Sequence, residues 1–117
     1  MMQTKGIRGA ITVKENSISA LKEATIELLN ELLQANNIDI NKISHIIFTT
    51  TNDLNAEYPA KFARTELGMN KTAMMCFHEL DVPASLPMCL RILIVYNCDE
   101  NFEPVFAYLK GAENLRK

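Results

Sequence analysis

The sequence lacks the features that mark membrane and disulfide-stabilised secreted proteins. No apolar run is longer than five residues, as in Ile92 to Tyr96, whereas a membrane-spanning helix needs about 20. The N-terminal stretch MMQTKGIRGA contains no apolar signal region. There are only three cysteines, an odd number without a CxxC spacing, which makes a poor disulfide framework. These absences predict a cytoplasmic protein with no membrane partner.

Neither sign of charge dominates the sequence. The net charge of −2 leaves no broad basic surface, so nucleic acid is not an expected partner. No linker, repeat or low-complexity stretch divides the 117 residues, and we expect a single domain over 1–117. Hydrophobic residues make up 48% of the chain and charged residues 22%, values typical of globular proteins rather than of disordered or coiled-coil chains.

Most common catalytic patterns are missing as well. The sequence has no Ser–His–Asp set, no glycine-rich phosphate loop and no paired carboxylates. Cys76 and His78 could share one face of a strand, but two ligands do not complete a zinc site, and His45 lies far off in the sequence. We therefore do not expect a metal ion.

The hydrophobic pattern that is present predicts two helices and five strands. From Ile18 to Ala35 apolar residues recur at steps of three and four, which indicates an amphipathic helix, and Asn36 and Asn37 suit its end. A second helix is predicted to begin at Pro59 and to stop at Gly68. The predicted strands are Lys5–Val13, Ile43–Thr50, Ala73–Phe77, Leu90–Tyr96 and Val105–Leu109.

This order of elements predicts an α+β fold, with a mixed five-stranded sheet and two helices on one of its faces. The opposite face of the sheet also carries apolar residues, and a chain of 117 residues leaves nothing to cover it. Copies of a chain usually cover such a surface by associating through the open face or its edges. We therefore expect a homo-oligomer.

Arg91 is the most informative charged residue, because it interrupts the apolar segment LRILIVY. Alternation along a strand places it on the same face as Leu93 and Val95. A guanidinium keeps its proton, so it needs an anion or a wet cleft in such surroundings. A strand-end arginine that reaches solvent or a structural carboxylate is the commoner arrangement, and the position alone leaves both interpretations open.

The other basic candidates have ordinary alternatives. Arg8 lies in GIRGA, where flanking glycines would let a ligand approach closely, although a surface arginine fits equally well. Lys61 and Arg64 are three residues apart and share one helix face, yet Lys61 could simply pair with Glu57. Arg116 lies in a terminal segment that composition alone would describe as mobile.

Three further candidates come from the strands. Glu79 follows the apolar segment AMMCF, where a carboxylate could bond to backbone amides. Cys76 could be a small core residue, and Tyr108 a half-buried strand aromatic with its hydroxyl in water. Together, several cations with one carboxylate favour the binding of a small dianion over bond cleavage by nucleophilic attack.

Four stretches of the sequence resemble the AroH-class chorismate mutases. They are GIRGAITV, IIFTTTNDLNAEYPAKFAR, CFHELDVPASLPMCLRILIVY and YLKGAENLR, and they span nearly the whole chain in order. The resemblance implies a small trimeric enzyme that forms a pseudo-α/β barrel, with active sites between adjacent subunits. It also implies the conversion of chorismate to prephenate without a cofactor or a covalent intermediate.

The resemblance further implies roles for individual residues. Arg91 would face the ether oxygen of chorismate, Arg8 would bind a carboxylate, and Cys76 and Glu79 would face the ring hydroxyl. The other residues that match the family's site are Tyr58, Lys61, Arg64, Tyr108 and Arg116.

The sequence departs from the family pattern at a few positions and leaves two other functions open. Tyr58 replaces the commoner phenylalanine, and Asn52 stands where proline is common. A Rid-type enamine/imine deaminase would share the trimeric architecture and a strand arginine, but lacks the GIRGA and C-x-x-E patterns. A non-catalytic module that binds a small dicarboxylate is the second alternative.

Overall fold

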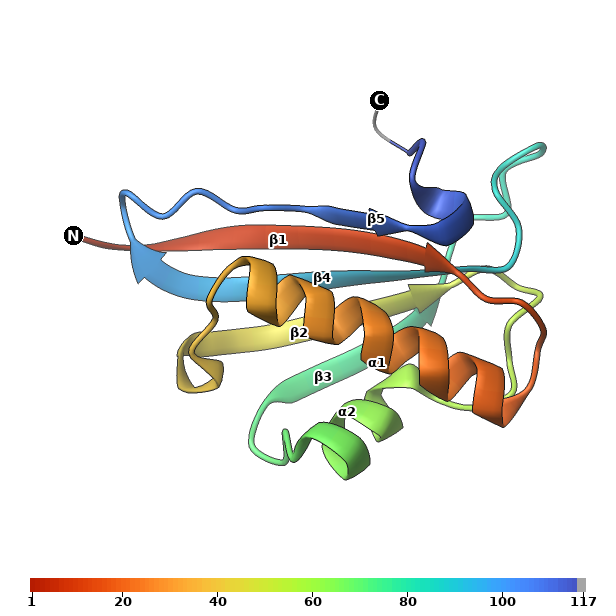
Figure 1. The fold of residues 1–117 in the computed structure, drawn as a ribbon, viewed down its shortest axis with the longest axis horizontal. Helices are drawn as coiled ribbons and strands as arrows, with labels where there is room; N and C mark the ends of the chain where they lie inside the picture. Colours follow the sequence, from red (N-terminus) through yellow and green to blue (C-terminus); the bar gives the residue numbers. More distant parts are fainter. Residues whose placement is uncertain (116–117) are drawn as a thin grey trace.

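A computed structural model describes residues 1–115, and its five strands form a single sheet (Figure 1). The strands are β1 (Met2–Thr12), β2 (Ile43–Thr50), β3 (Ala73–His78), β4 (Cys89–Asp99) and β5 (Ala107–Leu109). Their order across the sheet is β3-β2-β4-β1-β5. β4 runs antiparallel to β1 and β2 on either side of it, whereas β3 is parallel to β2 and β5 is parallel to β1. The predicted mixed five-stranded sheet is confirmed.

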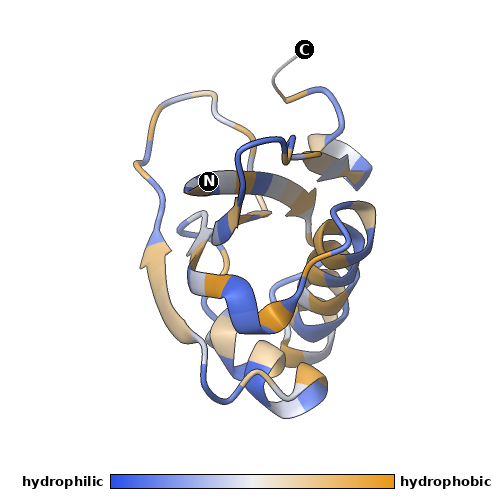
Figure 2. Cartoon of the chain, turned by 90° about the vertical axis from the view of Figure 1, so that its left-hand side faces the viewer, coloured by the Kyte–Doolittle hydropathy of each residue, from blue (hydrophilic) through white to orange (hydrophobic). Residues whose placement is uncertain are grey.

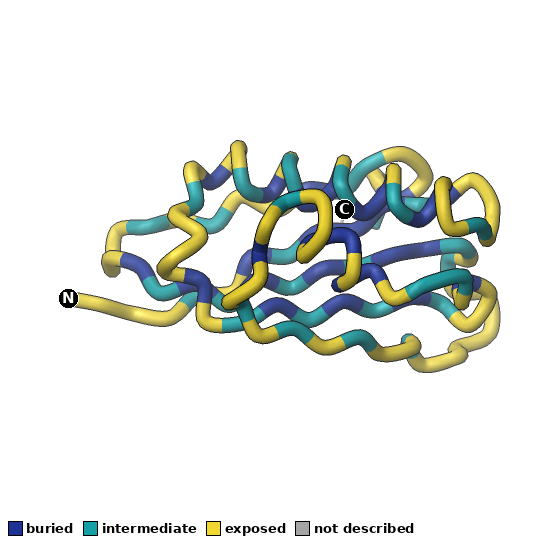
Figure 3. The backbone as a smooth tube through the Cα atoms, turned by 90° about the horizontal axis from the view of Figure 1, so that it is seen from below, coloured by how far each residue is buried: buried dark blue, intermediate teal, exposed yellow. Residues whose placement is uncertain are grey.

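Both helices lie on one face of this sheet (Figures 2 and 3). α1 (Ile18–Ala35) begins where the Ser17 hydroxyl oxygen accepts a hydrogen bond of 3.2 Å from the Ala20 amide, as an N-cap should. α2 (Pro59–Leu67) begins at a proline and ends at Gly68, whose φ of 68° is left-handed. Local capping chemistry therefore explains why the predicted helix bounds agree with the structure. Two short 3₁₀ helices span Ile40–Lys42 and Lys110–Ala112.

The core lies between the sheet and α1. Leu28 and Leu32 of α1 are fully buried against β1 at Gly9. A Cβ atom at Gly9 would lie only 3.0 Å from a methyl carbon of each leucine and 2.9 Å from a backbone oxygen of β5. The helix and the last strand can therefore approach β1 this closely only because residue 9 has no side chain.

Neither helix covers the other face of the sheet in residues 1–115. Only near the carboxyl end of β1 is this face covered, where Ala112 of the second 3₁₀ helix forms a buried cluster with Ala10 and Cys89. Along β4 the residues that face the helices are buried, while Leu93 and Val95 on the opposite face are only half-buried. Met75 and Phe77 of β3 leave 60% and 47% of their surface exposed. The alternation in β4 confirms that Arg91 belongs to this open face.

Several strand ends differ from the prediction, because strand pairing and side-chain contacts override the local sequence pattern. The ladder between β1 and β4 extends to the pair Met2 and Asp99, so both strands are longer than predicted. The last strand begins at Ala107 rather than Val105. The amide side chain of Asn36 bonds to the Val105 N–H at 2.7 Å and to its carbonyl at 2.8 Å, which removes Val105 from the ladder.

Candidate active site

A row of residues crosses the open face of the sheet near the carboxyl end of β1. The register pairs Ala10 of β1 with Tyr108 of β5 on one side and with Arg91 of β4 on the other. Arg91 is in turn paired with Thr49 of β2. Because paired residues project from the same face of a sheet, this register brings four strands' side chains to one place.

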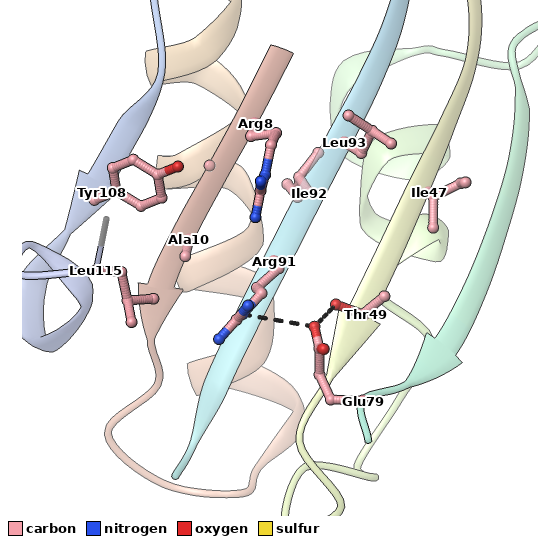
Figure 4. A pocket seen from close by; sticks show the side chains of 11 residues that line it. Arg8, Ala10, Ile47, Thr49, Glu79, Arg91, Ile92, Leu93, Tyr108 and Leu115 are labelled. Carbon is pink, nitrogen blue, oxygen red and sulfur yellow. Dashed lines mark hydrogen bonds and ion pairs between the residues drawn. The ribbon is translucent and has the colours of Figure 1, made fainter. Parts of the chain in front are cut away.

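These side chains line a pocket of about 410 Å³, which we call the strand-face pocket (Figure 4). The volume lies within the range of small-molecule sites. The small side chain of Ala10 leaves space between Tyr108 and Arg91, and Arg8 adds a second guanidinium from β1. The complete lining is Arg8, Gly9, Ala10, Ile47, Thr49, Glu79, Arg91, Ile92, Leu93, Tyr108 and Leu115.

Arg91 and Glu79 form the charged centre of the strand-face pocket. The Nε atom of Arg91 lies 3.6 Å from Oε2 of Glu79, and the two side chains are 36% and 25% exposed. That separation is an ion pair but is too long for a hydrogen bond. Within residues 1–115, the buried Nε atom has no hydrogen-bond partner, so its N–H can still donate to another acceptor.

Tyr108 supplies a second donor of the same kind. Its hydroxyl oxygen is buried and has no hydrogen-bond partner in the described part of the chain. A buried polar group without a partner costs roughly 1–3 kcal/mol, so two of them in one pocket call for an explanation. Both point to a ligand that carries acceptor oxygens, and Arg8 nearby favours a ligand with negative charge.

The remaining candidate residues gather elsewhere, around a second pocket of about 430 Å³. Tyr58, Cys76 and His78 line this helix-edge pocket, which lies between the start of α2 and β3. Tyr58 is 69% exposed. Cys76 packs against the buried core, on the side of β3 that faces away from the exposed Met75 and Phe77 side chains. Cys76 and His78 therefore share one strand face, as predicted.

Cys76 is held as a neutral thiol in the helix-edge pocket. Burial raises the pKa of the Cys76 thiol, against smaller opposing effects from the Ala60 amide and the charge of Arg64. A neutral thiol is a weak hydrogen-bond donor rather than a nucleophile. Arg64 is exposed on α2, the helix that borders this pocket, three residues after Lys61.

Lys61 is engaged with a neighbouring carboxylate. Its Nζ atom lies 3.0 Å from Oε1 of Glu57, one helical turn away, which confirms the pairing considered from the sequence. The Tyr58 amide donates to the other carboxylate oxygen at 3.0 Å. These two contacts, the amide first, lower the pKa of Glu57.

The structure thus divides the residues predicted from the sequence into two groups within one chain. The strand-face pocket holds Arg8, Glu79, Arg91 and Tyr108. The other group, at or beside the helix-edge pocket, comprises Tyr58, Lys61, Arg64 and Cys76. A single chain does not bring Cys76 together with Glu79, and Arg116 lies outside the described residues.

Among the lining residues that were not predicted from the sequence, Thr49 and Leu115 have the clearest roles. Thr49 hydrogen bonds to the Glu79 carboxylate, and Leu115 closes one end of the strand-face pocket (Figure 4). Strand alternation was a usable signal for Thr49, because it places this polar residue on the face opposite the buried Phe48. No local pattern marks Leu115, which reaches the pocket through the turn that follows β5.

Residues 1–115 contain no group of three or more His, Cys, Asp or Glu side chains that could hold a metal ion. Within the same range, neither helix combines the length and apolarity needed to cross a membrane.

Comparison with known proteins assigns a family to this arrangement. Residues 4–117 match the family described as chorismate mutase type I. The chain is 41% identical to chorismate mutase AroH of Thermus thermophilus, over 96% of this chain and 93% of the relative. It is 30% identical to chorismate mutase AroH of Bacillus subtilis, over 84% and 77% of the two chains. A solved chorismate mutase from Clostridium thermocellum superposes with a TM-score of 0.86 at 40% identity, covering 92% of this chain and 96% of that one. The chain belongs to the type I, or AroH-class, chorismate mutase family.

Proposed function

We propose that the strand-face pocket binds chorismate and catalyses its rearrangement to prephenate. The observation that carries this proposal is the pair of buried donors without partners, Arg91 Nε and the Tyr108 hydroxyl, beside the guanidinium of Arg8. Chorismate has two carboxylates, an ether oxygen and a ring hydroxyl, and so offers the acceptors and negative charge that these groups require.

The reaction explains why a cation matters more here than a nucleophile. One C–O bond breaks and one C–C bond forms within the same molecule, and negative charge grows on the ether oxygen in the transition state. A fixed cation at that oxygen stabilises the transition state more than the ground state. We assign this role to Arg91, whose Nε–H is held in the pocket without a hydrogen-bond partner among residues 1–115.

The other groups of the strand-face pocket would hold the reactive conformer. The substrate must fold into a compact shape in which the two reacting carbons approach each other. Arg8 and Tyr108 would bind a carboxylate, and Glu79 would accept a hydrogen bond from the ring hydroxyl. Each group sits on a strand or directly after one, so the sheet fixes its place before the substrate arrives.

The helix-edge group would complete the site from a neighbouring copy in a homotrimer. The open face of the sheet carries half-buried and exposed apolar residues, which a second copy would cover. Tyr58, Lys61, Arg64 and Cys76 would then reach the strand-face pocket of the adjacent subunit. We assign Arg116 to substrate binding as well, on the family resemblance alone.

The same family resemblance supports a cytoplasmic biosynthetic enzyme that needs no cofactor. The mechanism above uses only hydrogen bonds and fixed charges, so neither a metal ion nor a thiolate takes part in it. On this proposal the product, prephenate, enters the synthesis of phenylalanine and tyrosine.

A direct assay tests the proposed function. The purified protein is incubated with chorismate and a chelator, the loss of chorismate absorbance is followed, and the product is identified as prephenate. The Arg91→Ala variant serves as the control for a contaminating enzyme and should lose nearly all activity. No conversion by the parent protein, or equal conversion by the variant, would show that this pocket does not perform the reaction.

A further inference from the structure

We propose that Thr49 is a positioning residue for Glu79, an inference that rests on the proposed function. Thr49 lies on β2, half-buried on the open face, and lines the strand-face pocket. Its hydroxyl donates a hydrogen bond to Oε2 of Glu79 (Figure 4). The same carboxylate oxygen is the one that lies 3.6 Å from Arg91 Nε.

The Glu79 side chain needs an interaction that fixes its orientation, because Glu79 lies where β3 ends and an irregular connection begins. It follows the last residue of β3 and begins a connection to β4 that contains neither helix nor strand. Its backbone is tied to the sheet by one hydrogen bond of 2.8 Å, from its N–H to the Thr50 carbonyl. Beyond the backbone, a glutamate side chain retains considerable rotational freedom. The Thr49 hydroxyl removes much of that freedom by fixing one carboxylate oxygen.

The register makes this contact specific. Thr49 and Arg91 are directly paired across β2 and β4, so their Cβ atoms lie about 5 Å apart. The Glu79 carboxylate reaches this pair from the end of β3 and interacts with both residues through Oε2. The second oxygen, Oε1, is then available for the substrate hydroxyl.

The hydroxyl of Thr49 also separates the carboxylate from the cation. Arg91 Nε and Glu79 Oε2 are at ion-pair distance but are not hydrogen bonded. Without the competing donor on β2, the carboxylate would move onto the guanidinium and form a charge-assisted hydrogen bond. That bond would occupy the donor that the ether oxygen needs and would partly neutralise its charge. Thr49 therefore acts on the chemistry through both Glu79 and Arg91.

The central experiment removes the hydroxyl while keeping the shape of the side chain. Thr49→Val preserves the β-branched shape that suits a strand, and Thr49→Ser keeps the hydroxyl in a smaller side chain. Losing a hydrogen bond to a charged group costs roughly tenfold to a hundredfold in an equilibrium or a rate. We expect a fall of that size in kcat for Thr49→Val, a change of less than about threefold in KM, and near-parent kcat for Thr49→Ser.

A matched control and a structural check keep this result interpretable. Thr4→Val also removes a hydroxyl that bonds across two strands, to the Asn97 side chain at 2.9 Å, but away from the pocket. It should leave kcat within about twofold of the parent. Thr49→Ala, which adds no apolar bulk, is measured alongside in case the valine variant does not assemble, and should show the same loss of kcat.

A double-mutant cycle with Glu79→Ala separates positioning from direct contact. If Thr49 acts through Glu79, Thr49→Val should cost less than about twofold more in the Glu79→Ala background. A full loss in that background would overturn the proposal, because it would mean that the Thr49 hydroxyl touches the substrate itself. Unchanged kcat in Thr49→Val would also overturn it. If instead the parent protein does not convert chorismate at all, the proposed function fails, and the inference fails with it for a distinguishable reason.

Discussion

Mixing two inactive variants should restore activity if the site is shared between subunits. Arg91→Ala damages the strand-face pocket, while Arg64→Ala damages the group beside the helix-edge pocket. One chain places these groups at two separate pockets, lined by different residues. A site formed between subunits therefore draws its first group from one chain and its second group from the neighbour.

The expected gain follows from counting such sites. In a randomised equal mixture, a site is intact when its first group comes from an Arg64→Ala chain and its second group comes from an Arg91→Ala chain. Each condition is met half the time, so about one quarter of the sites in a closed ring of subunits should be intact. The mixed protein should then show about one quarter of the parent kcat/KM per subunit, although each variant alone is nearly inactive.

The assay is co-expression of the two variants in equal amounts with the same tag, purification of the whole mixture through that tag, and steady-state measurement with chorismate. The matched control pairs Arg91→Ala with Arg8→Ala, both of which damage the strand-face pocket. No mixture of these two chains contains an intact first group, so it should gain nothing. If the Arg91→Ala and Arg64→Ala mixture performs no better than the mean of its two components, the shared site is wrong.

Three other changes test individual residues. Replacing Arg91 by neutral citrulline should lower turnover by at least two to three powers of ten, or about 3–4 kcal/mol, and should weaken substrate binding far less. Single-turnover rates and dissociation constants measure these two effects. A rate within threefold of the parent would refute the assignment of Arg91. Glu57→Gln should release Lys61 from its 3.0 Å ion pair, so that Lys61 is free to bind the substrate. KM should then fall by no more than about fivefold at constant kcat, because exposed ion pairs are weak. A higher KM would mean that the ion pair itself positions Lys61. Cys76→Ser should keep most activity, measured as kcat/KM, because a hydroxyl still donates a hydrogen bond; near-complete loss would point to a specific need for the thiol.

The helices could be predicted closely because their signals are local. The bounds of α1 depend on helical periodicity, the Ser17 cap and the asparagines that follow the helix. The strand ends depended on contacts that no local pattern contains. Met2 belongs to β1 because Asp99 is there to pair with it, and Val105 leaves the sheet because Asn36, 69 residues away in sequence, binds its backbone.

The charged residues of the candidate site could be predicted from the sequence, but their division between two pockets could not. Alternation placed Arg91 on the open face, and the family resemblance selected the other charged groups. Neither showed that Cys76 and Glu79 point into different pockets, since these residues are only three positions apart. An odd spacing along a strand sends side chains to opposite faces, so the separation follows from β3 continuing to His78 and from the return of Glu79 toward Thr49.

The spacing of the binding groups is a property of the sheet rather than of any single residue. Tyr108 and Arg91 lie on strands that flank β1, and Ala10 is the partner of both. Neighbouring strands are about 4.8 Å apart, so the two side chains are rooted about 10 Å from each other, a span that suits the opposite ends of a small dianion. A slip of one residue between β1 and β4 would turn Arg91 toward α1 and bury an unpaired guanidinium in the core. The register of β4 against its two neighbours, β1 and β2, thus both keeps Arg91 out of the core and sets it opposite Thr49 and beside Glu79. The strand register that the fold needs for a stable core is therefore also the register that assembles the proposed catalytic centre.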